Sequence, residues 1–504
     1  MQNAETNRQP LTAGSFFTSA SCIRNSAFVL IALFALAVRL PQLADRPMHT
    51  DEAINGYIVG DLLAGKPFHY DPQDRHGPVL YLLAEPVTRL CGAKNLADLT
   101  ETELRLTPVI IGSAMILLFG AAVEIVGFIP CLIAALLFAF APLPVYYSRY
   151  FIHETLFVAA TFGLILAGWR TLKKNSVPLA ALTGLCASLM LAGKETAVLH
   201  FAALAGAVVC GWLLKREKFP SQKIVATAFL VFIAATVLLF TWFGKNWLAL
   251  SDLTHVVSRF AARAGGEGHE KPFWYYAQLL TSGISGYVTL AMAVLGIFLV
   301  VKQPAKNRFL TLLAIYAVLV FLIYSAIPYK TPWLALNFFL PLTVFAGIFV
   351  ERLWLAAARC SWRLVILIFL AATGFFLARD TAKFVFKIPA DETNPYAYAH
   401  TSEDILNLAP KVDELARKNN ITNPKIAVVM KDAWPMPWYL RKFSSVGFWQ
   451  PDKKIGDADF FITASDPPTG LTNRLNGMRS DFFGVRPNVL ILLWTPAVAD
   501  GHQP

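Results

Sequence analysis

Long runs of apolar residues recur along this chain, with few polar positions inside them. A run of about 20 apolar residues is long enough to cross a membrane as a helix. The pattern predicts eleven spans, at residues 26–41, 105–126, 128–143, 154–170, 177–193, 196–214, 223–243, 276–301, 309–327, 333–350 and 361–378. We therefore expect a multi-pass α-helical membrane protein.

Three segments outside these spans, residues 42–104, 244–275 and 379–504, are long enough to hold structure of their own. In the first, apolar residues recur with a helical period over 53–64 and 80–90, which predicts two amphipathic helices on the membrane surface. In the last, a helical pattern at 402–418 and short strand patterns at 425–430, 459–463 and 489–494 predict a small α/β domain. We expect a transmembrane domain over 1–378 and an external domain over 379–504.

Composition supports a membrane protein, and charge gives its orientation. The chain is 56% hydrophobic and 15% charged, whereas soluble domains carry about 25% charged residues. On a soluble chain, the formal net charge of +11 would suggest a nucleic-acid partner. Here the cations concentrate in short loops, and such loops face the cytoplasm. These cations are Arg170, Lys173, Lys174, Lys215, Arg216, Lys218, Lys223, Lys302, Lys306, Arg308, Arg352, Arg359 and Arg363.

This orientation places the N-terminus, with Arg8 and Arg24, in the cytoplasm and the C-terminal domain outside, in a cytoplasmic membrane. It excludes a nucleic-acid partner. Only Cys91 of the six cysteines falls in an external loop, so we expect no disulfide framework.

The external ends hold most of the remaining polar residues. Asp51 and Glu52 follow the first span, and neighbouring side chains point in different directions, by about 100° on a helix. One carboxylate could therefore meet an acceptor and the other a donor or a metal. The simpler interpretation is that both begin a helix, whose N-terminus favours acidic residues. Arg75 and His76 lie in the same external segment and could be ordinary headgroup contacts.

Two further polar clusters lie at the same ends. Arg149 and His153 are four residues apart, and Glu154 begins the next span. An interfacial arginine often extends to lipid headgroups instead. In the turn 327–333, Lys330 is the only charge between two prolines. It could hold a lipid-linked phosphate or only extend to the interface. Tyr57, Tyr329 and Trp333 are candidates for contacts with a sugar or a lipid, although interfacial aromatic residues are common.

No phosphate-binding loop, zinc-protease motif or serine-hydrolase motif is present. No cofactor is indicated with certainty. Asp51, His153 and Glu154 could contribute ligands to a divalent metal ion, but their spacing is not diagnostic.

Together, Asp51-Glu52 and the Arg149 to Glu154 cluster resemble the GT-C glycosyltransferase superfamily, including protein O-mannosyltransferases and lipid A aminoarabinose transferases. With Arg39-Leu40-Pro41, the 328–333 turn and the Trp434 to Arg441 motif, the chain is most similar to the "flippase activity-associated" membrane protein family. The likeness covers about residues 26–495. Unlike the mannosyltransferases, this chain has no folded insertion between spans, and its C-terminal domain differs from theirs.

The resemblance implies transfer of a hexose or pentose from a polyprenyl phosphate to an acceptor hydroxyl at the outer face, with inversion. Asp51 would be the general base, Glu52 would orient the donor or acceptor, and Glu154 matches a second acidic position. The candidates for the donor phosphate are Arg75, His76, Arg149, His153 and Lys330. The acceptor could be a glycan, a lipid or a protein.

The sequence leaves two other functions open. A flippase for lipid-linked oligosaccharides, or an accessory to one, would need polar or broken helices near the bilayer midplane. The candidates there are weak: Glu124, Lys194 and Glu195. A scaffold would use the Trp434 to Arg441 motif to bind envelope proteins, although the simpler interpretation of that motif is the packed contact between the external domain and the membrane part.

Overall fold

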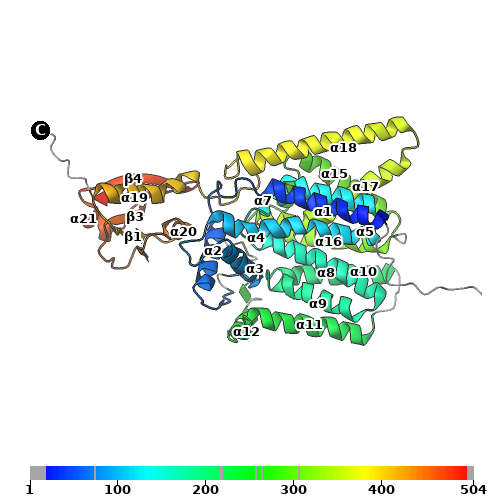
Figure 1. Ribbon diagram of the computed structural model, residues 1–504, viewed down its shortest axis with the longest axis horizontal. Coiled ribbons are helices and arrows are strands. Elements are labelled where there is room, and N and C mark those ends of the chain that lie inside the picture. The colour runs from blue at the N-terminus through cyan, green and yellow to red at the C-terminus, as the bar shows by residue number, and fades with distance from the viewer. Residues whose placement is uncertain are drawn as a thin grey trace, which may run out of the picture.

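A computed structural model describes residues 19–72, 75–214, 220–255, 258–259, 262, 265–266, 268–304 and 307–496. Two parts lie along the long axis of the molecule (Figure 1). A bundle of long helices forms one end, and a domain with a β-sheet forms the other. Lys215, Arg216, Lys218 and Lys306, which contribute to the predicted orientation, lie outside the described residues, as do Arg8 and residues 497–504.

Each predicted span contains a helix. The long helices are α1 (Ser19–Arg39), α4 (Glu101–Ala114) followed by α5 (Ile116–Val126), α6 (Phe128–Phe140), α8 (Glu154–Lys174), α9 (Val177–Leu191), α10 (Ala197–Leu214), α11 (Gln222–Phe240), α15 (Gly283–Val301), α16 (Arg308–Ala326), α17 (Leu336–Ala356) and α18 (Cys360–Thr381). Within the described residues, eight helical segments are long and apolar enough to cross a membrane, and α6 and α9 are shorter. The multi-pass helical fold is confirmed, whereas the number of spans stays a prediction.

Short elements connect these helices at their ends. They are α7 (Pro142–Tyr147), α12 (Ala249–Asp252), η1 (Leu253–His255), α14 (Tyr275–Leu280), η2 (Pro332–Ala335) and η3 (Ala382–Lys387). The predicted span 276–301 is divided at residues 281–282, between α14 and α15. Gly283, the first residue of α15, has a φ of 72°, which an L-residue with a side chain adopts only with strain.

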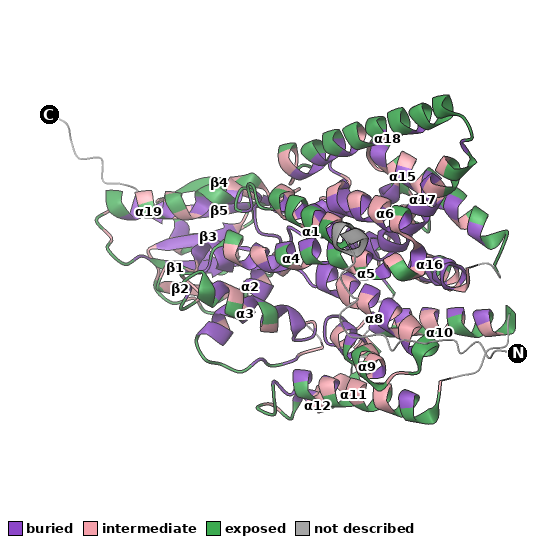
Figure 2. Cartoon of the chain, turned by 45° about the vertical axis from the view of Figure 1, so that its right-hand side comes forward, coloured by how far each residue is buried: buried purple, intermediate pink, exposed green. Residues whose placement is uncertain are grey.

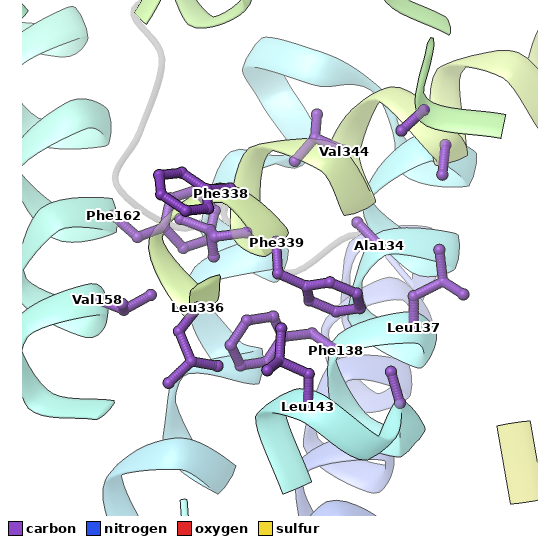
Figure 3. Packing of buried hydrophobic residues seen from close by; sticks show 14 of the residues in the cluster. Ala134, Leu137, Phe138, Leu143, Val158, Phe162, Leu336, Phe338, Phe339 and Val344 are labelled. Carbon is purple, nitrogen blue, oxygen red and sulfur yellow. The ribbon is translucent and has the colours of Figure 1, made fainter. Parts of the chain in front are cut away.

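The core of the bundle is built around α17. In the segment that contains this helix, 89% of the most apolar window is buried. Phe338 and Phe339 of α17 lie among side chains of α6 and α8, such as Phe138 and Phe162 (Figure 3). A Cβ atom at Gly347 would lie 2.3 Å from the carbonyl oxygen of Pro130, so only glycine permits this helix crossing. In contrast, α18 is exposed along most of its length (Figure 2).

The two predicted amphipathic helices are α2 (Thr50–Leu63) and α3 (Val79–Leu90). Their setting differs from the prediction, because α2 is buried on several sides rather than lying on a membrane surface. A Cβ atom at Gly56 would lie 2.7 Å from the ring of Trp438, which belongs to the C-terminal domain. Helix α2 is therefore enclosed between the two parts of the molecule (Figure 1).

The C-terminal domain has one five-stranded sheet of order β2-β1-β3-β5-β4. Its strands are β1 (Lys425–Val429), β2 (Ser445–Trp449), β3 (Phe460–Ala464), β4 (Met478–Arg486) and β5 (Val489–Pro496). Strands β2 and β3 pair parallel to β1, whereas β5 pairs antiparallel to both β3 and β4. The domain's helices are η4 (Glu403–Asn407), α19 (Leu408–Lys418), α20 (Met436–Leu440), η5 (Thr469–Leu471) and α21 (Thr472–Leu475).

The predicted α/β character of this domain is confirmed. The edge strands β2 and β4 were not predicted, because each carries polar or glycine residues among its apolar ones. The division of the chain at residue 378 stays a prediction.

Candidate functional site

The first turn of α2 is held by the carboxylate of Glu52, which is fully buried. Arg105 donates to both of its oxygens at 2.9 Å, and Arg46 donates to it at 2.9 Å. The backbone amides of Phe151 and His49 donate at 2.9 and 3.0 Å. Burial alone would raise the pKa of Glu52, but the positive charges of Arg105 and Arg46 and these hydrogen bonds lower it to about 2. Glu52 is therefore an anchoring carboxylate in this structure.

His49 completes this turn as the N-cap of α2. Its Nδ1 atom accepts a hydrogen bond from the backbone amide of Asp51 at 3.1 Å, and Glu52 returns a bond to the amide of His49. This reciprocal arrangement is a capping box. The turn that carries Asp51 is thus fixed by its own backbone and by Glu52.

Asp51 differs from Glu52 in its surroundings. Its side chain is 48% exposed, and its Oδ2 atom lies 4.0 Å from Nδ1 of His49. The predicted divergence of the two carboxylates is therefore present: Glu52 points into the protein, and Asp51 is partly open. Both carboxylates also lie in the first turn of α2. The simpler interpretation, that the two residues begin a helix whose N-terminus favours acidic side chains, therefore holds as well.

Aromatic residues lie next to this turn. The ring of Trp333 is 5.7 Å from that of His49 and 5.9 Å from that of Tyr398. His269 connects the group, since its ring is 4.9 Å from that of Tyr329 and its Nδ1 atom is bonded to the hydroxyl of Tyr398. The structure thus brings Asp51, Trp333 and Tyr329 to one region.

Lys330 lies in the same region, but its ammonium group is bonded within the protein. It donates to the carbonyl oxygen of Lys271 at 3.1 Å and to that of Ile327. The side chain is buried, and burial lowers the pKa of Lys330 below its usual value. These bonds join the turn 327–331 to the segment around Lys271.

A second polar cluster forms where α8 begins and the α9–α10 hairpin turns. Glu154 is paired with Lys194. Glu195 accepts from the hydroxyl of Tyr70 at 2.9 Å and is bonded to Nδ1 of His76 at 2.7 Å. The His76 side chain is 34% exposed, so the cluster opens to the surface there.

His153 lies inside this second cluster, with its ring 5.1 Å from that of His76. Burial, followed by the charges of His76 and Lys194, holds the pKa of His153 well below its usual value. Burial therefore favours the neutral imidazole of His153, and its Nε2 atom is buried without a hydrogen-bond partner among the described residues.

The remaining predicted phosphate ligands lie elsewhere. Arg149 donates to the carbonyl oxygens of Arg39, Pro41 and Gln42, so it fixes the turn after α1. Arg75 is half-buried and donates to the carbonyl oxygen of His69 at 3.3 Å. The five candidates for the donor phosphate therefore do not form one cluster, and their roles stay predictions.

The Trp434 to Arg441 motif forms the contact between the two parts of the chain. Nε1 of Trp438 donates to Glu101 at 2.6 Å, and Arg441 donates to the carbonyl oxygen of Leu99 at 2.7 Å. Tyr57, a candidate for a sugar or lipid contact, donates its hydroxyl to the carbonyl oxygen of Pro437 at 2.7 Å.

The C-terminal domain also binds the residue that precedes His49. The amide of Met48 donates to the hydroxyl of Tyr439 at 2.8 Å, and its carbonyl oxygen accepts from Thr401 at 2.6 Å. All three residues are buried. The turn that carries Asp51 is therefore held by both parts of the molecule.

Removing the Tyr439 hydroxyl tests this contact. Tyr439→Phe leaves the buried amide of Met48 without an acceptor, which costs about 1–3 kcal/mol. We expect a lower unfolding temperature of the purified protein in detergent. Tyr287→Phe, at a tyrosine that is 62% exposed, is the matched control. Equal unfolding temperatures for the two variants would show that the contact does not stabilise the protein.

Gly77 permits the close approach of the 75–79 loop to the α9–α10 hairpin. A Cβ atom there would lie 2.2 Å from the carbonyl oxygen of Ala192, which accepts from the amide of Val79 at 3.1 Å. We expect Gly77→Ala to destabilise the protein by about 1–3 kcal/mol, as a lower unfolding temperature. Gly456→Ala, where a Cβ atom meets nothing within 4 Å, should stay near the wild type. The close packing would be refuted if both variants unfolded alike.

Several residues of the two clusters were not among the predicted site residues. Arg46, Arg105 and Tyr398 gave no sequence signal that separates them from other loop residues. Lys194 and Glu195 did give one, because they are adjacent charges between two apolar spans. The described residues contain no group of three or more His, Cys, Asp or Glu side chains that could hold a divalent metal ion. The requirement for a metal stays untested.

Comparison with known proteins identifies the fold. No protein-family model matches the sequence, and no curated protein matches it. The structure of ArnT from Cupriavidus metallidurans bound to undecaprenyl phosphate is similar over 96% of this chain and 100% of its own, with a TM-score of 0.67 and 14% identity.

A second similar structure is the archaeal oligosaccharyltransferase AglB from Archaeoglobus fulgidus with an inhibitory peptide and a dolichol-phosphate. It covers 97% of this chain and 75% of its own, with a TM-score of 0.59 and 11% identity. The arabinofuranosyltransferase AftD from Mycobacteria covers 95% of this chain and 40% of its own, with a TM-score of 0.50 and 14% identity. The predicted "flippase activity-associated" subgroup is not tested by these matches. The chain has the fold of the GT-C glycosyltransferases.

Proposed function

We propose that the protein is a membrane glycosyltransferase that moves a sugar from a polyprenyl phosphate to an acceptor hydroxyl. The observation that carries this proposal is the contrast between Asp51 and Glu52. One carboxylate is neutralised by two arginines, and its neighbour is left partly open on a fixed turn beside aromatic side chains. The lipid phosphates bound to ArnT and AglB support the donor class.

In this reaction the bond between the anomeric carbon and the phosphate oxygen breaks, and a bond from the acceptor oxygen to that carbon forms. Asp51 accepts the proton of the acceptor hydroxyl as the new bond forms, because a sugar hydroxyl is too weak an acid to ionise beforehand. The polyprenyl phosphate leaves with the bonding electrons. Attack opposite the leaving group inverts the anomeric carbon.

The departing phosphate gains negative charge, which nearby cations stabilise. Among the predicted ligands, His76 is partly exposed and belongs to the second polar cluster, which also contains Lys194 paired with Glu154. We assign the phosphate end of the donor to this cluster and the acceptor to the Asp51 side. Trp333 and Tyr329 would contact the sugar.

The proposed site faces away from the cytoplasm. Glu154 begins α8, and Arg170, Lys173 and Lys174 lie at its other end, 16 to 20 residues later. A helix of 21 residues is about 31 Å long, close to the thickness of the bilayer core. Since short basic loops face the cytoplasm, the polar clusters lie at the external face of the cytoplasmic membrane.

The test is transfer by the purified full-length protein in vesicles that contain polyprenyl-phosphate sugars, with glycan, lipid and peptide acceptors. Mass spectrometry should detect a glycosylated acceptor and free polyprenyl phosphate. The same vesicles also report movement of the lipid across the bilayer. Movement of the lipid without any sugar transfer would contradict the proposal and favour a flippase.

A further inference from the structure

The turn of residues 49–51 carries polar atoms that the protein itself does not satisfy. The side chain of His49 is 5% exposed, and its Nε2 atom is buried without a hydrogen-bond partner among the described residues. The Oγ1 atom of Thr50 is also buried without a partner there. Asp51 follows with its partly open carboxylate. Buried polar atoms without a partner are rare in native proteins, so two of them beside the proposed base require a physical reason.

The hydrogen bonds of His49 determine where its ring carries a proton. Nδ1 accepts from the backbone amide of Asp51 at 3.1 Å, so this nitrogen has no proton. The neutral ring therefore carries its proton on Nε2, which is the unpartnered atom. In this tautomer Nε2 is a hydrogen-bond donor and cannot act as a base or a metal ligand. A buried donor without an acceptor costs stability, and an oxygen atom of a substrate would satisfy it.

The donor of His49 and the carboxylate of Asp51 are close enough to bind one small molecule together. Oδ2 of Asp51 lies 4.0 Å from Nδ1 of His49, and Nε2 belongs to the same five-membered ring. A hydroxyl that gives its proton to Asp51 therefore has its neighbouring atoms near Nε2. A sugar presents a second hydroxyl on the next carbon, whereas a simple lipid alcohol or a serine side chain presents only one.

The surroundings of the His49 ring are aromatic. The ring of Trp333 lies edge-to-face at 5.7 Å, and that of Tyr150 lies at 6.3 Å. The hydroxyl of Tyr150 is bonded to that of Tyr146 at 2.8 Å. These rings cover His49 in the free protein, so an acceptor must displace one of them to reach Nε2. Hydrogen bonds of a catalytic site often form fully only when the substrate binds.

We propose that His49 is a substrate-binding residue and that the acceptor is a carbohydrate. Nε2 of His49 donates to the hydroxyl next to the one that attacks, while Asp51 takes the proton of the attacking hydroxyl. One turn of the protein thus orients two adjacent hydroxyls of the acceptor. The assignment rests on the proposed function and narrows its acceptor from a glycan, a lipid or a protein to a glycan. No bond to His49 forms or breaks in the reaction.

Two substitutions separate the roles of the two ring nitrogens. Asparagine is a preferred N-cap residue, and its Oδ1 atom can take the place of Nδ1, so His49→Asn keeps the cap and removes the Nε2 donor. Glutamine is not a preferred N-cap residue, but its longer side chain places an amide donor where Nε2 lies. His49→Gln therefore weakens the cap and keeps a donor. His255→Asn, at an exposed histidine of η1, is the control.

The experiment measures transfer by the purified full-length protein in vesicles that contain polyprenyl-phosphate sugars. The acceptors are methyl glucoside, methyl galactoside and methyl mannoside, their monodeoxy analogues, a lipid alcohol and a serine peptide. We expect the wild type to use a hexoside and to lose about 10-fold in kcat/KM when the hydroxyl next to the attacking one is absent, the effect of one hydrogen bond.

His49→Asn should lose the same factor with the complete hexoside, mainly through a higher KM, and lose nothing more with that deoxy analogue. The two changes are not additive because both remove one contact. His49→Gln should again discriminate against the deoxy analogue, at a lower unfolding temperature. His49→Asn should unfold near the wild type, and His255→Asn should match the wild type in every measurement.

Equal kcat/KM for His49→Asn and His255→Asn would show that His49 only caps α2 or binds a trapped water, and would overturn its role in binding. Transfer to the lipid alcohol or the peptide but to no hexoside would overturn the carbohydrate acceptor and leave the proposed transferase intact. Failure of the wild type with every acceptor would instead overturn the proposed function, and this inference with it. The three results are distinguishable because only the last one leaves the wild type inactive.

Discussion

Asp51→Asn is expected to lower the rate of sugar transfer by about 100- to 10,000-fold, the usual contribution of a general base. Asparagine has nearly the shape of aspartate but cannot accept the proton of the acceptor hydroxyl. The Asp51 side chain makes no hydrogen bond among the described residues, and its contact with His49 is at 4.0 Å. The substitution should therefore leave stability almost unchanged, and transfer in vesicles together with unfolding temperature measures both effects.

Asp61→Asn is the matched control for this prediction. Asp61 lies on the same helix, its side chain is 50% exposed, and it pairs with Lys66 away from the aromatic residues. The control should transfer sugar at the wild-type rate. If Asp51→Asn is as active as Asp61→Asn, Asp51 is not the base, and the mechanism proposed for this site is wrong.

The helices of the membrane part could be predicted because hydropathy is a local property. A span must be apolar along its whole length, whatever its neighbours are. Local patterns also gave α19, from its helical period, and the inner strands β1, β3 and β5, from short apolar runs. They missed β2 and β4, because an edge strand needs fewer apolar residues than a central one.

The candidate site was harder to predict, since the partner of a charge is set by tertiary structure. Lys330 and Arg149 are conspicuous cations in the sequence, yet both bind carbonyl oxygens within the protein. Glu52 is adjacent to Asp51, but its main partner, Arg105, lies 53 residues away at the start of another helix. Residue type and spacing indicated which segments carry the charged side chains of the site. They could not identify the partner of each charge.

Glu52→Gln is expected to destabilise the protein by roughly 3–5 kcal/mol, the cost of breaking a buried ion pair by removing one partner. Glutamine keeps the shape of the side chain but leaves the charges of Arg46 and Arg105 uncompensated. Its amide group also offers donors where the arginines and the amide of Phe151 need an acceptor. A much lower unfolding temperature and a reduced yield of folded protein are the expected results.

The pH dependence of the unfolding free energy distinguishes the contribution of this ion network from that of side-chain packing. The pKa of Glu52 is lowered from 4.5 to about 2 in the folded protein. A group with a lowered pKa contributes stability above its ordinary pKa and loses that contribution as the pH falls towards the folded value. The wild type should therefore lose stability between about pH 4.5 and pH 2 more steeply than Glu52→Gln, which has no carboxyl group to protonate.

Glu85→Gln provides the comparison, because Glu85 pairs with Arg89 on the surface of α3 with one helical turn between them. Such a pair contributes about 0.2–0.5 kcal/mol, so this variant should unfold near the wild type and keep its acid profile. If Glu52→Gln behaved like Glu85→Gln, the two arginines would not need the carboxylate. The turn that presents Asp51 would then be held by the capping box and the bonds of Met48 to the C-terminal domain alone.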